Sequence, residues 1–156
     1  MGTGKSSVGR ELAQRKKWQF LDLDDLIEEK EGLSIAEIFR EKKEPYFRSL
    51  EKKCLAEASL KKDQVIACGG GIVIDPDNIA VMKQTGCMVC LTASPGVILA
   101  RTRRFSHRPL LNVADPEAEI RALLKKRAPF YSLATITVDT SSLSIPDVVQ
   151  KIIQSI

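Results

Sequence analysis

Met1-Gly2-Thr3-Gly4-Lys5-Ser6-Ser7 opens the chain, and this stretch decides how the rest of the sequence is interpreted. Its residues 1–6 match the last part of the phosphate-binding loop pattern G-x-x-x-x-G-K-[ST]. The first Gly of that pattern, and the strand that precedes it, are not in the sequence. A glycine-rich turn in a flexible N-terminus is the alternative interpretation.

Each part of this stretch meets the negative charge of a polyphosphate in a different way. Gly2 and Gly4 have no Cβ, so the backbone can curl until its N–H groups point at phosphate oxygens. Lys5 can contact the same phosphates, and the Ser6 hydroxyl is placed to hold Mg²⁺. A helix expected over residues 6–16 adds the partial positive charge of its N-terminus. The stretch therefore predicts a site for nucleotide phosphates and a magnesium ion.

The composition is that of one soluble globular domain. The chain has 156 residues, of which 44% are hydrophobic and 28% charged, and this suits a single core. A net charge of +4 and only 5% aromatic residues do not indicate a surface that stacks nucleic-acid bases. No apolar run approaches the roughly 18 residues of a membrane span, and no signal region is present. We therefore expect a cytoplasmic protein with no membrane or nucleic-acid partner. We also expect a monomer.

The four cysteines, Cys54, Cys68, Cys87 and Cys90, suit the cytosol as reduced, mostly buried thiols. Cys87 and Cys90 have the C-x-x-C spacing, but no second Cys or His pair accompanies them. A redox or zinc site is therefore the less favoured interpretation.

Short apolar runs alternate with amphipathic segments along the chain, which is typical of an α/β fold with a parallel sheet. Four buried strands are expected at residues 19–23, 65–68, 88–91 and 135–138. Helices are expected at residues 6–16, 25–31, 34–40, 45–60, 77–84, 95–103, 116–127 and 146–154.

Two carboxylates follow the first expected strand. Asp22-Leu-Asp24 lies at the C-terminal end of residues 19–23, where open parallel sheets bind ligands. Strand alternation would place Asp22 and Asp24 on the same side. One carboxylate could then join Ser6 at Mg²⁺ while the other accepts a proton from an attacking hydroxyl. The alternative is that Asp24 or Asp25 caps the next helix.

A second group of residues suits an anionic acceptor. Gly69-Gly70-Gly71 follows the second expected strand, and its amides could bind a carboxylate or hydroxyl, although a tight turn is the alternative. Arg48 and Arg127 come from separate segments. Two such arginines suit bidentate capture of a carboxylate, and surface ion pairs are the alternative.

A lid is expected at residues 103–115. Residues 105–114 show no helical or strand periodicity and carry Arg108, and a basic loop between two helices can close over bound phosphates. For Arg103 and Arg104 a solvated surface is the favoured interpretation. The sole histidine, His107, lies in the same segment and is assigned no catalytic role.

Six motifs in order along nearly the whole chain resemble those of the shikimate kinases, which are P-loop small-molecule kinases. The motifs are Gly2-Thr-Gly-Lys-Ser-Ser-Val-Gly9, Leu21-Asp-Leu-Asp24, Phe47-Arg48 with Glu51, Gly69-Gly-Gly71, Arg108-Pro-Leu-Leu111 and Arg127-Ala-Pro-Phe-Tyr131. No single motif is that specific, but six in the same order are.

The resemblance implies transfer of the γ-phosphoryl group of ATP to the 3-hydroxyl of shikimate, a step toward chorismate and the aromatic amino acids. It also implies Mg²⁺ as cofactor and a three-layer αβα fold around a parallel sheet. Residues 1–156 would form one domain with its lid at about 103–115. In the family, the first strand is central in a sheet of five strands.

Roles implied by the resemblance fall on matching positions. Asp24 would bind the substrate hydroxyls and act as base, with Lys5 and Arg108 as the other catalytic residues. Ser6 and Asp22 would hold the metal. The substrate-binding residues would be Asp24, Arg48, Gly70, Gly71 and Arg127, with the two arginines on the carboxylate. The ATP-binding residues would be Gly2, Thr3, Gly4, Lys5, Ser6, Ser7, Arg101 and Arg108, with Arg101 near adenine.

The central strand that the family places before the loop is missing from this chain, which would leave backbone groups of neighbouring strands without partners. We therefore expect a fragment or a misplaced start codon. Two alternatives for the function stay open. One is a gluconate kinase-like small-molecule kinase, which explains the two arginines and the triple glycine less well. The other is a shikimate-kinase-like binding module that is catalytically impaired.

Overall fold

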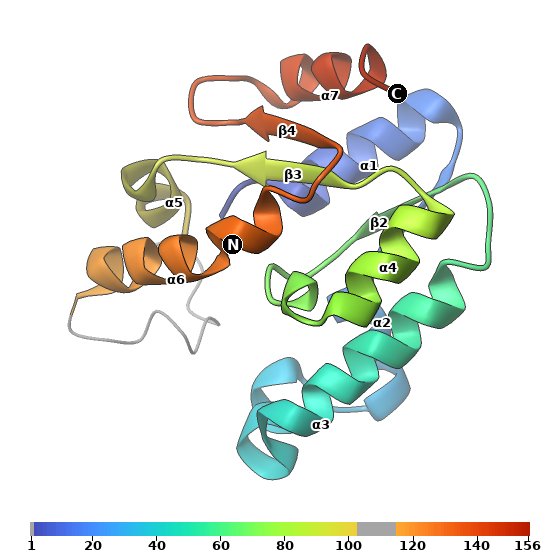
Figure 1. The fold of residues 1–156 in the computed structure, drawn as a ribbon, viewed down its shortest axis with the longest axis vertical. Helices are drawn as coiled ribbons and strands as arrows, with labels where there is room; N and C mark the ends of the chain where they lie inside the picture. Colours follow the sequence, from blue (N-terminus) through green and yellow to red (C-terminus); the bar gives the residue numbers. More distant parts are fainter. Residues whose placement is uncertain (1, 103–114) are drawn as a thin grey trace. The chain divides into compact units, whose positions relative to one another are not determined.

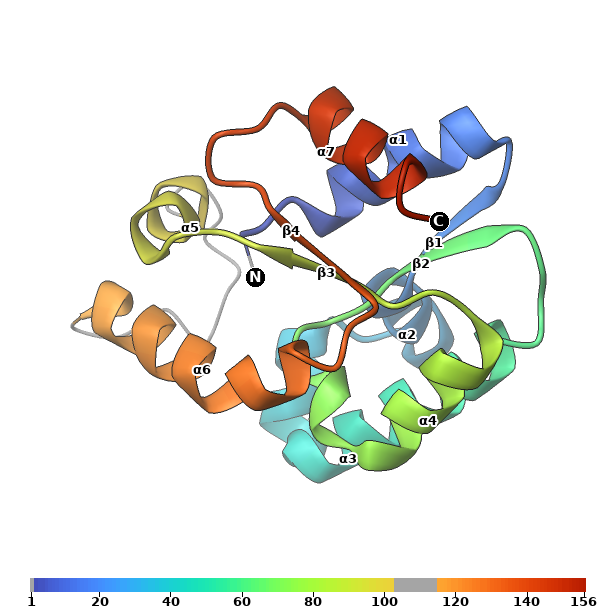
Figure 2. The ribbon, with the colours of Figure 1, turned by 45° about the horizontal axis from the view of Figure 1, so that its top comes forward.

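The computed structural model describes residues 2–102 and 115–156, and contacts divide the chain into two compact units. The N-terminal unit is Ser6–Gly86. The C-terminal unit combines the described residues of 1–5 with those of 87–156. In both units, a two-stranded parallel sheet is accompanied by helices (Figures 1 and 2).

The N-terminal unit is built on strands β1 (Gln19–Asp22) and β2 (Gln64–Ala67), which pair in parallel from Gln19 opposite Gln64 to Asp22 opposite Ala67. Its helices are α1 (Lys5–Lys16, whose first residue belongs to the other unit), α2 (Leu23–Glu31), α3 (Ile35–Ala58), the 3₁₀ turn η1 (Ile72–Ile74) and α4 (Pro76–Thr85). Figure 1 shows α4 beside α3. The core between these elements consists of Leu23, Ile27, Ile38, Phe47, Cys54, Leu55 and Ile72.

Helix α3 starts and bends for local reasons. Ser34 and Glu37 form a capping box, in which each satisfies a backbone N–H group of the first turn. Lys43 has φ 70° and ψ 167°, so the helix is kinked there and two helical segments meet. The sequence predicts these two segments separately, with Pro45 at the start of the second. The kink sets the direction of the second segment, which carries Arg48 and Glu51.

The C-terminal unit is built on β3 (Val89–Thr92) and β4 (Ile136–Asp139), which pair in parallel from Val89 opposite Ile136 to Thr92 opposite Asp139. Its helices are α5 (Pro95–Thr102), α6 (Pro116–Tyr131) and α7 (Ile145–Ile153). Figure 2 shows α7 beside β4 and α5 near α6. The buried centre of the α5–α6 contact is formed by Ala93, Ile98 and Ile120.

The α/β class and the parallel strands are confirmed, and the predicted helices and strands are present within a few residues of their expected ends wherever the structure describes them. Three details differ. Helix α2 begins at Leu23 and therefore includes Asp24, α6 continues through Pro129 to Tyr131, and η1 was not expected. The predicted lid falls outside the described residues except for Asp115, which caps α6 by accepting a hydrogen bond from the Ala118 amide.

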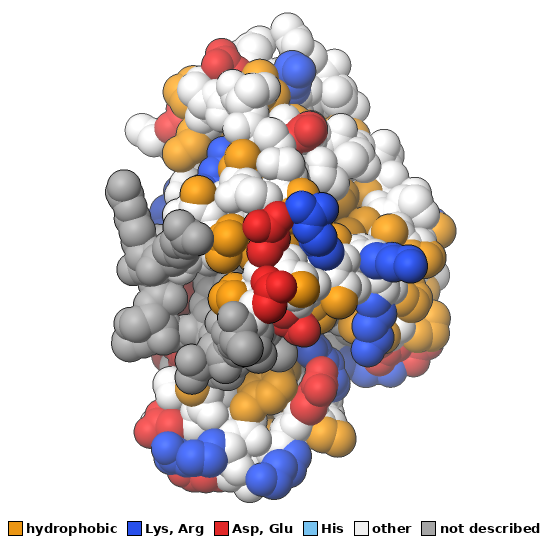
Figure 3. All heavy atoms as spheres, turned by 90° about the vertical axis from the view of Figure 1, so that its left-hand side faces the viewer, with side chains coloured by type: hydrophobic (Ala, Val, Ile, Leu, Met, Phe, Trp, Pro, Cys, Tyr) orange, Lys and Arg blue, Asp and Glu red, His pale blue; other side chains and the backbone are white. Residues whose placement is uncertain are grey.

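The surface and the thiols bear on the compositional predictions. Acidic and basic side chains are interspersed on the face that Figure 3 shows.

All four cysteines are free thiols, but only Cys54 is buried, and Cys87 is exposed. The expectation of mostly buried thiols is therefore wrong. Among the helices of residues 2–102 and 115–156, none has both the length and the apolar character to cross a membrane.

Candidate active site

The opening loop requires glycine at two positions. Gly2 has φ 67° and Gly4 has φ 88°, which side-chain-bearing residues rarely adopt. A Cβ on Gly2 would also lie 2.9 Å from Thr102 Cγ2 and 3.2 Å from the Ile98 carbonyl oxygen. Helix α1 begins immediately afterwards, at Lys5. The loop thus leads into a helix N-terminus whose first amides have no partner within the helix, as an anion site needs.

The loop backbone is fastened to the rest of the C-terminal unit by a buried hydroxyl. Thr140 Oγ1 lies 3.1 Å from the Thr3 carbonyl oxygen and 3.0 Å from that of Thr92, so its single proton can be shared between two acceptors. Arg101 donates from Nη1 to Thr140 Oγ1 (2.9 Å) and from Nη2 to the Thr140 carbonyl oxygen (2.7 Å). We call these four residues the threonine anchor. Sequence reasoning did not assign this role to Thr140, because one threonine after a strand carries no signal of a contact 137 residues away.

Ser6 and Asp22 are brought together, as the magnesium prediction requires. The Ser6 hydroxyl donates a hydrogen bond of 2.6 Å to Asp22 Oδ2. The other oxygen, Oδ1, accepts from the Asp24 amide at 3.2 Å and so caps α2. Asp22 is buried. The cap of α2 is therefore Asp22 and neither Asp24 nor Asp25, to which the alternative interpretation gave it, and Asp22 serves both the helix and the hydroxyl.

Asp24 reaches its position by a different route from the one predicted. It lies in the first turn of α2 rather than on the strand, so the argument from strand alternation is wrong. A Cβ placed on Gly69 would lie 3.3 Å from Asp24 Oδ1 and 3.0 Å from Glu51 Oε1. The helix start therefore places the Asp24 carboxylate against the glycine segment that follows β2.

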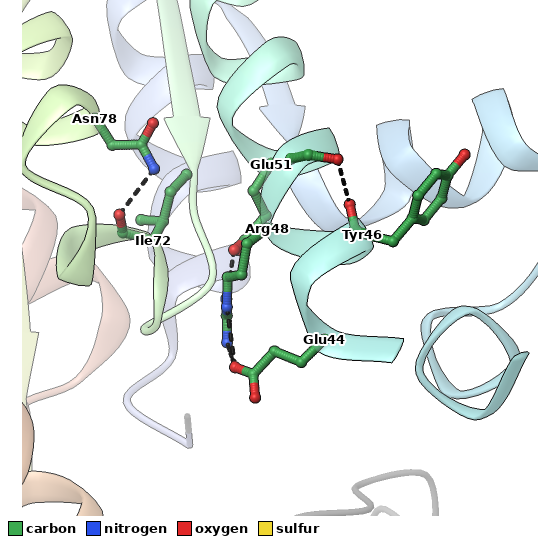
Figure 4. Close-up of polar contacts among 7 residues, drawn as sticks. Glu44, Tyr46, Arg48, Glu51, Ile72 and Asn78 are labelled. Carbon is green, nitrogen blue, oxygen red and sulfur yellow. Dashed lines mark hydrogen bonds and ion pairs between the residues drawn. The ribbon is translucent and has the colours of Figure 1, made fainter. Parts of the chain in front are cut away.

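Arg48 stands between two glutamates of its own helix (Figure 4). Its Nη1 group donates to Oε2 of Glu51, and its Nε and Nη2 groups donate to Oε1 of Glu44 at 3.1 Å and 2.8 Å. The spacings of three and four residues place all three side chains on one face of α3. Burial lowers the pKa of Arg48, but the hydrogen bond to Glu44 and the charge of Glu51 outweigh this, so its pKa is raised. The guanidinium group is a permanent cation.

The glycine segment packs directly on this cation. A Cβ on Gly71 would lie 2.7 Å from both Nη1 and Nη2 of Arg48, so a side chain there would displace the guanidinium group. The buried side-chain amide of Asn78 donates a hydrogen bond of 3.0 Å to the Ile72 carbonyl oxygen and so fixes η1, which follows the segment along the chain (Figure 4). We call the group of Asp24, Arg48, Glu51 and Gly69-Gly70-Gly71 the arginine cluster.

Glu51 belongs to one of the six motifs, but no binding or catalytic role was predicted for it from the sequence. Its side chain is 1% exposed, and a carboxylate that deep in a protein requires a cationic partner. The spacing of three residues from Arg48 on a predicted helix was the available signal. Asn78 carried no such signal, because buried asparagines are recognised only from tertiary structure.

The remaining predicted site residues belong to other segments of the chain. Arg127 is on α6 in the C-terminal unit, and its Nε atom is buried without a hydrogen-bond partner among the described residues. Lys5 and Ser7 lie in the first turn of α1. Arg108 is outside the described residues.

Comparisons with known proteins agree over the whole length. A family model described as shikimate kinase matches residues 1–156. A shikimate kinase of Caldanaerobacter subterraneus subsp. tengcongensis is 44% identical over 99% of this chain and 91% of the relative, and one of Thermus thermophilus is 42% identical over 100% and 85%. Among solved structures, the shikimate kinase from Acinetobacter baumannii in complex with shikimate aligns with a TM-score of 0.94 and 41% identity, covering 99% of this chain and 87% of that chain.

Proposed function

The chain belongs to the shikimate kinase family, which consists of ATP-dependent kinases, and on that premise we propose that it phosphorylates the 3-hydroxyl of shikimate. The observation that supports this choice of substrate is the arginine cluster. There the cation of Arg48 and the carboxylate of Asp24 both lie against the glycine segment. A hydroxy acid needs both, because its carboxylate requires a cation and its hydroxyl requires a proton acceptor. The gluconate kinase and impaired-module alternatives are not favoured by the comparisons.

In this proposal, residues of the arginine cluster, together with Arg127, bind shikimate and activate its hydroxyl. Arg48 binds the carboxylate of shikimate, and Arg127 contributes a second guanidinium group to it. Gly70 and Gly71 offer backbone groups to the ring. Asp24 accepts the proton of the attacking hydroxyl, since its carboxylate lies against the same glycine segment. The Nε of Arg127 is buried and has no hydrogen-bond partner within residues 2–102 and 115–156, which supports the assignment of Arg127, because a buried donor requires an acceptor.

The nucleotide occupies the opening loop. Lys5 contacts the phosphates together with backbone amides of Gly2, Thr3, Gly4, Ser6 and Ser7, and Arg101 lies toward adenine. Ser6 and Asp22 fit a magnesium ion, because both present oxygen atoms and Mg²⁺ takes few protein ligands beside phosphates and water. The bound ion supplies charge neutralisation for the phosphates. Phosphoryl transfer needs little more than alignment and neutralisation, so no covalent nucleophile is required of the chain.

We further propose that residues 1–156 act as one domain. In this proposal the lid at 103–115 brings Arg108 to the transferring phosphoryl group and excludes water. The Arg108→Ala variant should lose several orders of magnitude in turnover with its fold intact, as for other arginines that stabilise phosphoryl transfer. Turnover near the wild-type level would remove Arg108 from the mechanism. A monomer in the cytoplasm completes the proposal.

A coupled assay of ADP release tests this function. The chain is incubated with ATP and Mg²⁺, alone and with shikimate or gluconate. Release stimulated only by shikimate, with phosphorylated shikimate as product, is the expected result. Stimulation by gluconate would point to the other small-molecule kinase, and nucleotide binding without any stimulated release would point to a binding module.

A further inference from the structure

One edge of the Arg48 guanidinium group is occupied by Glu44, which has no role in the proposed reaction. Glu44 Oε1 accepts from both Nε and Nη2 of Arg48, at 3.1 Å and 2.8 Å (Figure 4). These two N–H groups form one of the edges at which an arginine binds a carboxylate in bidentate fashion. A carboxylate of the chain itself therefore lies where an acidic substrate would bind.

The Nη1–Nη2 side of the guanidinium group is crowded. Nη1 and Nη2 lie 2.7 Å, and Cζ lies 2.9 Å, from the point where a Cβ on Gly71 would be, so the glycine backbone packs against this side of the group. Nη1 is also engaged by Glu51. Only the Nε–Nη2 edge can exchange its partner without disturbing the glycine segment.

The two glutamates differ sharply in burial. The Glu51 side chain is 1% exposed, Arg48 is 30% exposed and Glu44 is 60% exposed. A pair that solvent reaches contributes little, whereas removing one partner of a buried pair leaves an uncompensated charge. Glu51 is thus a fixed partner of Arg48, and Glu44 is an exchangeable one.

We propose that Glu44 is a tethered competitor for the substrate carboxylate, which occupies the open edge of Arg48 in the free protein and is displaced when the substrate binds. This inference rests on the proposed function, because it takes Arg48 as the carboxylate-binding residue. The competition sets the affinity of the site, since every anion that binds must first displace Glu44. It favours a ligand that gains further contacts over one that offers a carboxylate alone.

Calorimetric titration of shikimate into the wild-type protein and into Glu44→Gln and Glu44→Ala variants tests the inference. Both variants should bind shikimate about two- to five-fold more tightly, which is the range that exposed ion pairs of this kind span. The KM for shikimate should fall by a similar factor while kcat changes little. Glu44 is mostly exposed, so the variants should keep the wild-type melting temperature.

Glu41→Gln is the matched control. Glu41 is exposed on the same helix and pairs with Arg40 at 2.8 Å, so its replacement removes the same charge without touching Arg48. Equal tightening in this control would assign the effect to net charge and overturn the inference. Unchanged or weaker binding in both Glu44 variants would overturn it as well. Failure of the wild-type protein to bind shikimate would instead refute the proposed function, and the inference would fall with it.

Discussion

The arginine cluster and the threonine anchor hold their parts in opposite ways. In the arginine cluster, charged groups three and four residues apart on one helix fix a cation against glycine. In the threonine anchor, one hydroxyl group, to which Arg101 also donates, joins segments as distant as Thr3 and Thr140 without any carboxylate. The first arrangement is set by helix periodicity, whereas the second exists only after β3, β4 and the opening loop have come together.

The two arrangements also differ in the free energy that a substitution costs. A buried charge that loses its partner usually costs about 3–5 kcal/mol. A neutral buried hydrogen bond contributes about 1 kcal/mol. Changes in the arginine cluster should therefore have larger effects than changes in the threonine anchor. They should also act on the acceptor, while changes in the anchor act on the nucleotide.

Breaking the buried pair of the arginine cluster should have the largest effect. In a Glu51→Gln variant, the buried hydrogen bond from Arg48 loses its charged acceptor, although Arg48 keeps Glu44 as a partner, so the free energy of unfolding should fall by about 2–3 kcal/mol and the KM for shikimate should rise. Urea denaturation and steady-state kinetics measure the two effects. The control is Glu57→Gln, which removes an exposed glutamate from the same helix. Equal losses in both variants would contradict the special position of Glu51.

Filling the space beside Arg48 tests the glycine side of the same cluster. A Gly71→Ala variant places a methyl group 2.7 Å from two guanidinium nitrogens, so Arg48 must move. We expect the KM for shikimate to rise about ten-fold, or 1.4 kcal/mol, with the KM for ATP unchanged. Gly86→Ala is the control, because a Cβ there meets nothing within 4 Å. An unchanged KM in Gly71→Ala would show that Arg48 does not need its observed position.

Removing the hydroxyl of the threonine anchor should have the smallest effect. A Thr140→Val variant keeps the side-chain shape but leaves the Thr3 carbonyl oxygen and Arg101 Nη1 without this partner. The free energy of unfolding should fall by about 1–2 kcal/mol, and the KM for ATP should rise while the affinity for shikimate is kept. Thr137→Val on β4, where the threonine is exposed, should change neither. A larger effect on shikimate than on ATP would reverse the comparison.

Many of the helices and strands could be predicted from the sequence, because the signals for them are local. The capping box at Ser34 and Glu37, the proline after Asp115 and the short apolar runs are local signals, and the elements that they predict are present. The proximity of Ser6 and Asp22 was also expected, because each belongs to a motif that predicts binding of the same magnesium ion.

The parts that sequence reasoning missed depend on tertiary structure. Whether Asp24 ends a strand or begins a helix depends on where α2 is capped, and the cap is Asp22, one residue before the helix. Asn78 and Thr140 act through carbonyl oxygens of residues that no spacing rule connects to them. The role of Glu51 was within reach, because its distance from Arg48 along the helix is a local signal.

A crystal structure of the protein with shikimate and ADP tests the central claim most directly. We predict that the carboxylate of shikimate lies on the Nε–Nη2 edge of Arg48, with Glu51 still bound to Nη1 and with Asp24 facing a ring hydroxyl. Shikimate bound away from Arg48, with the guanidinium group still held by Glu44, would contradict the account.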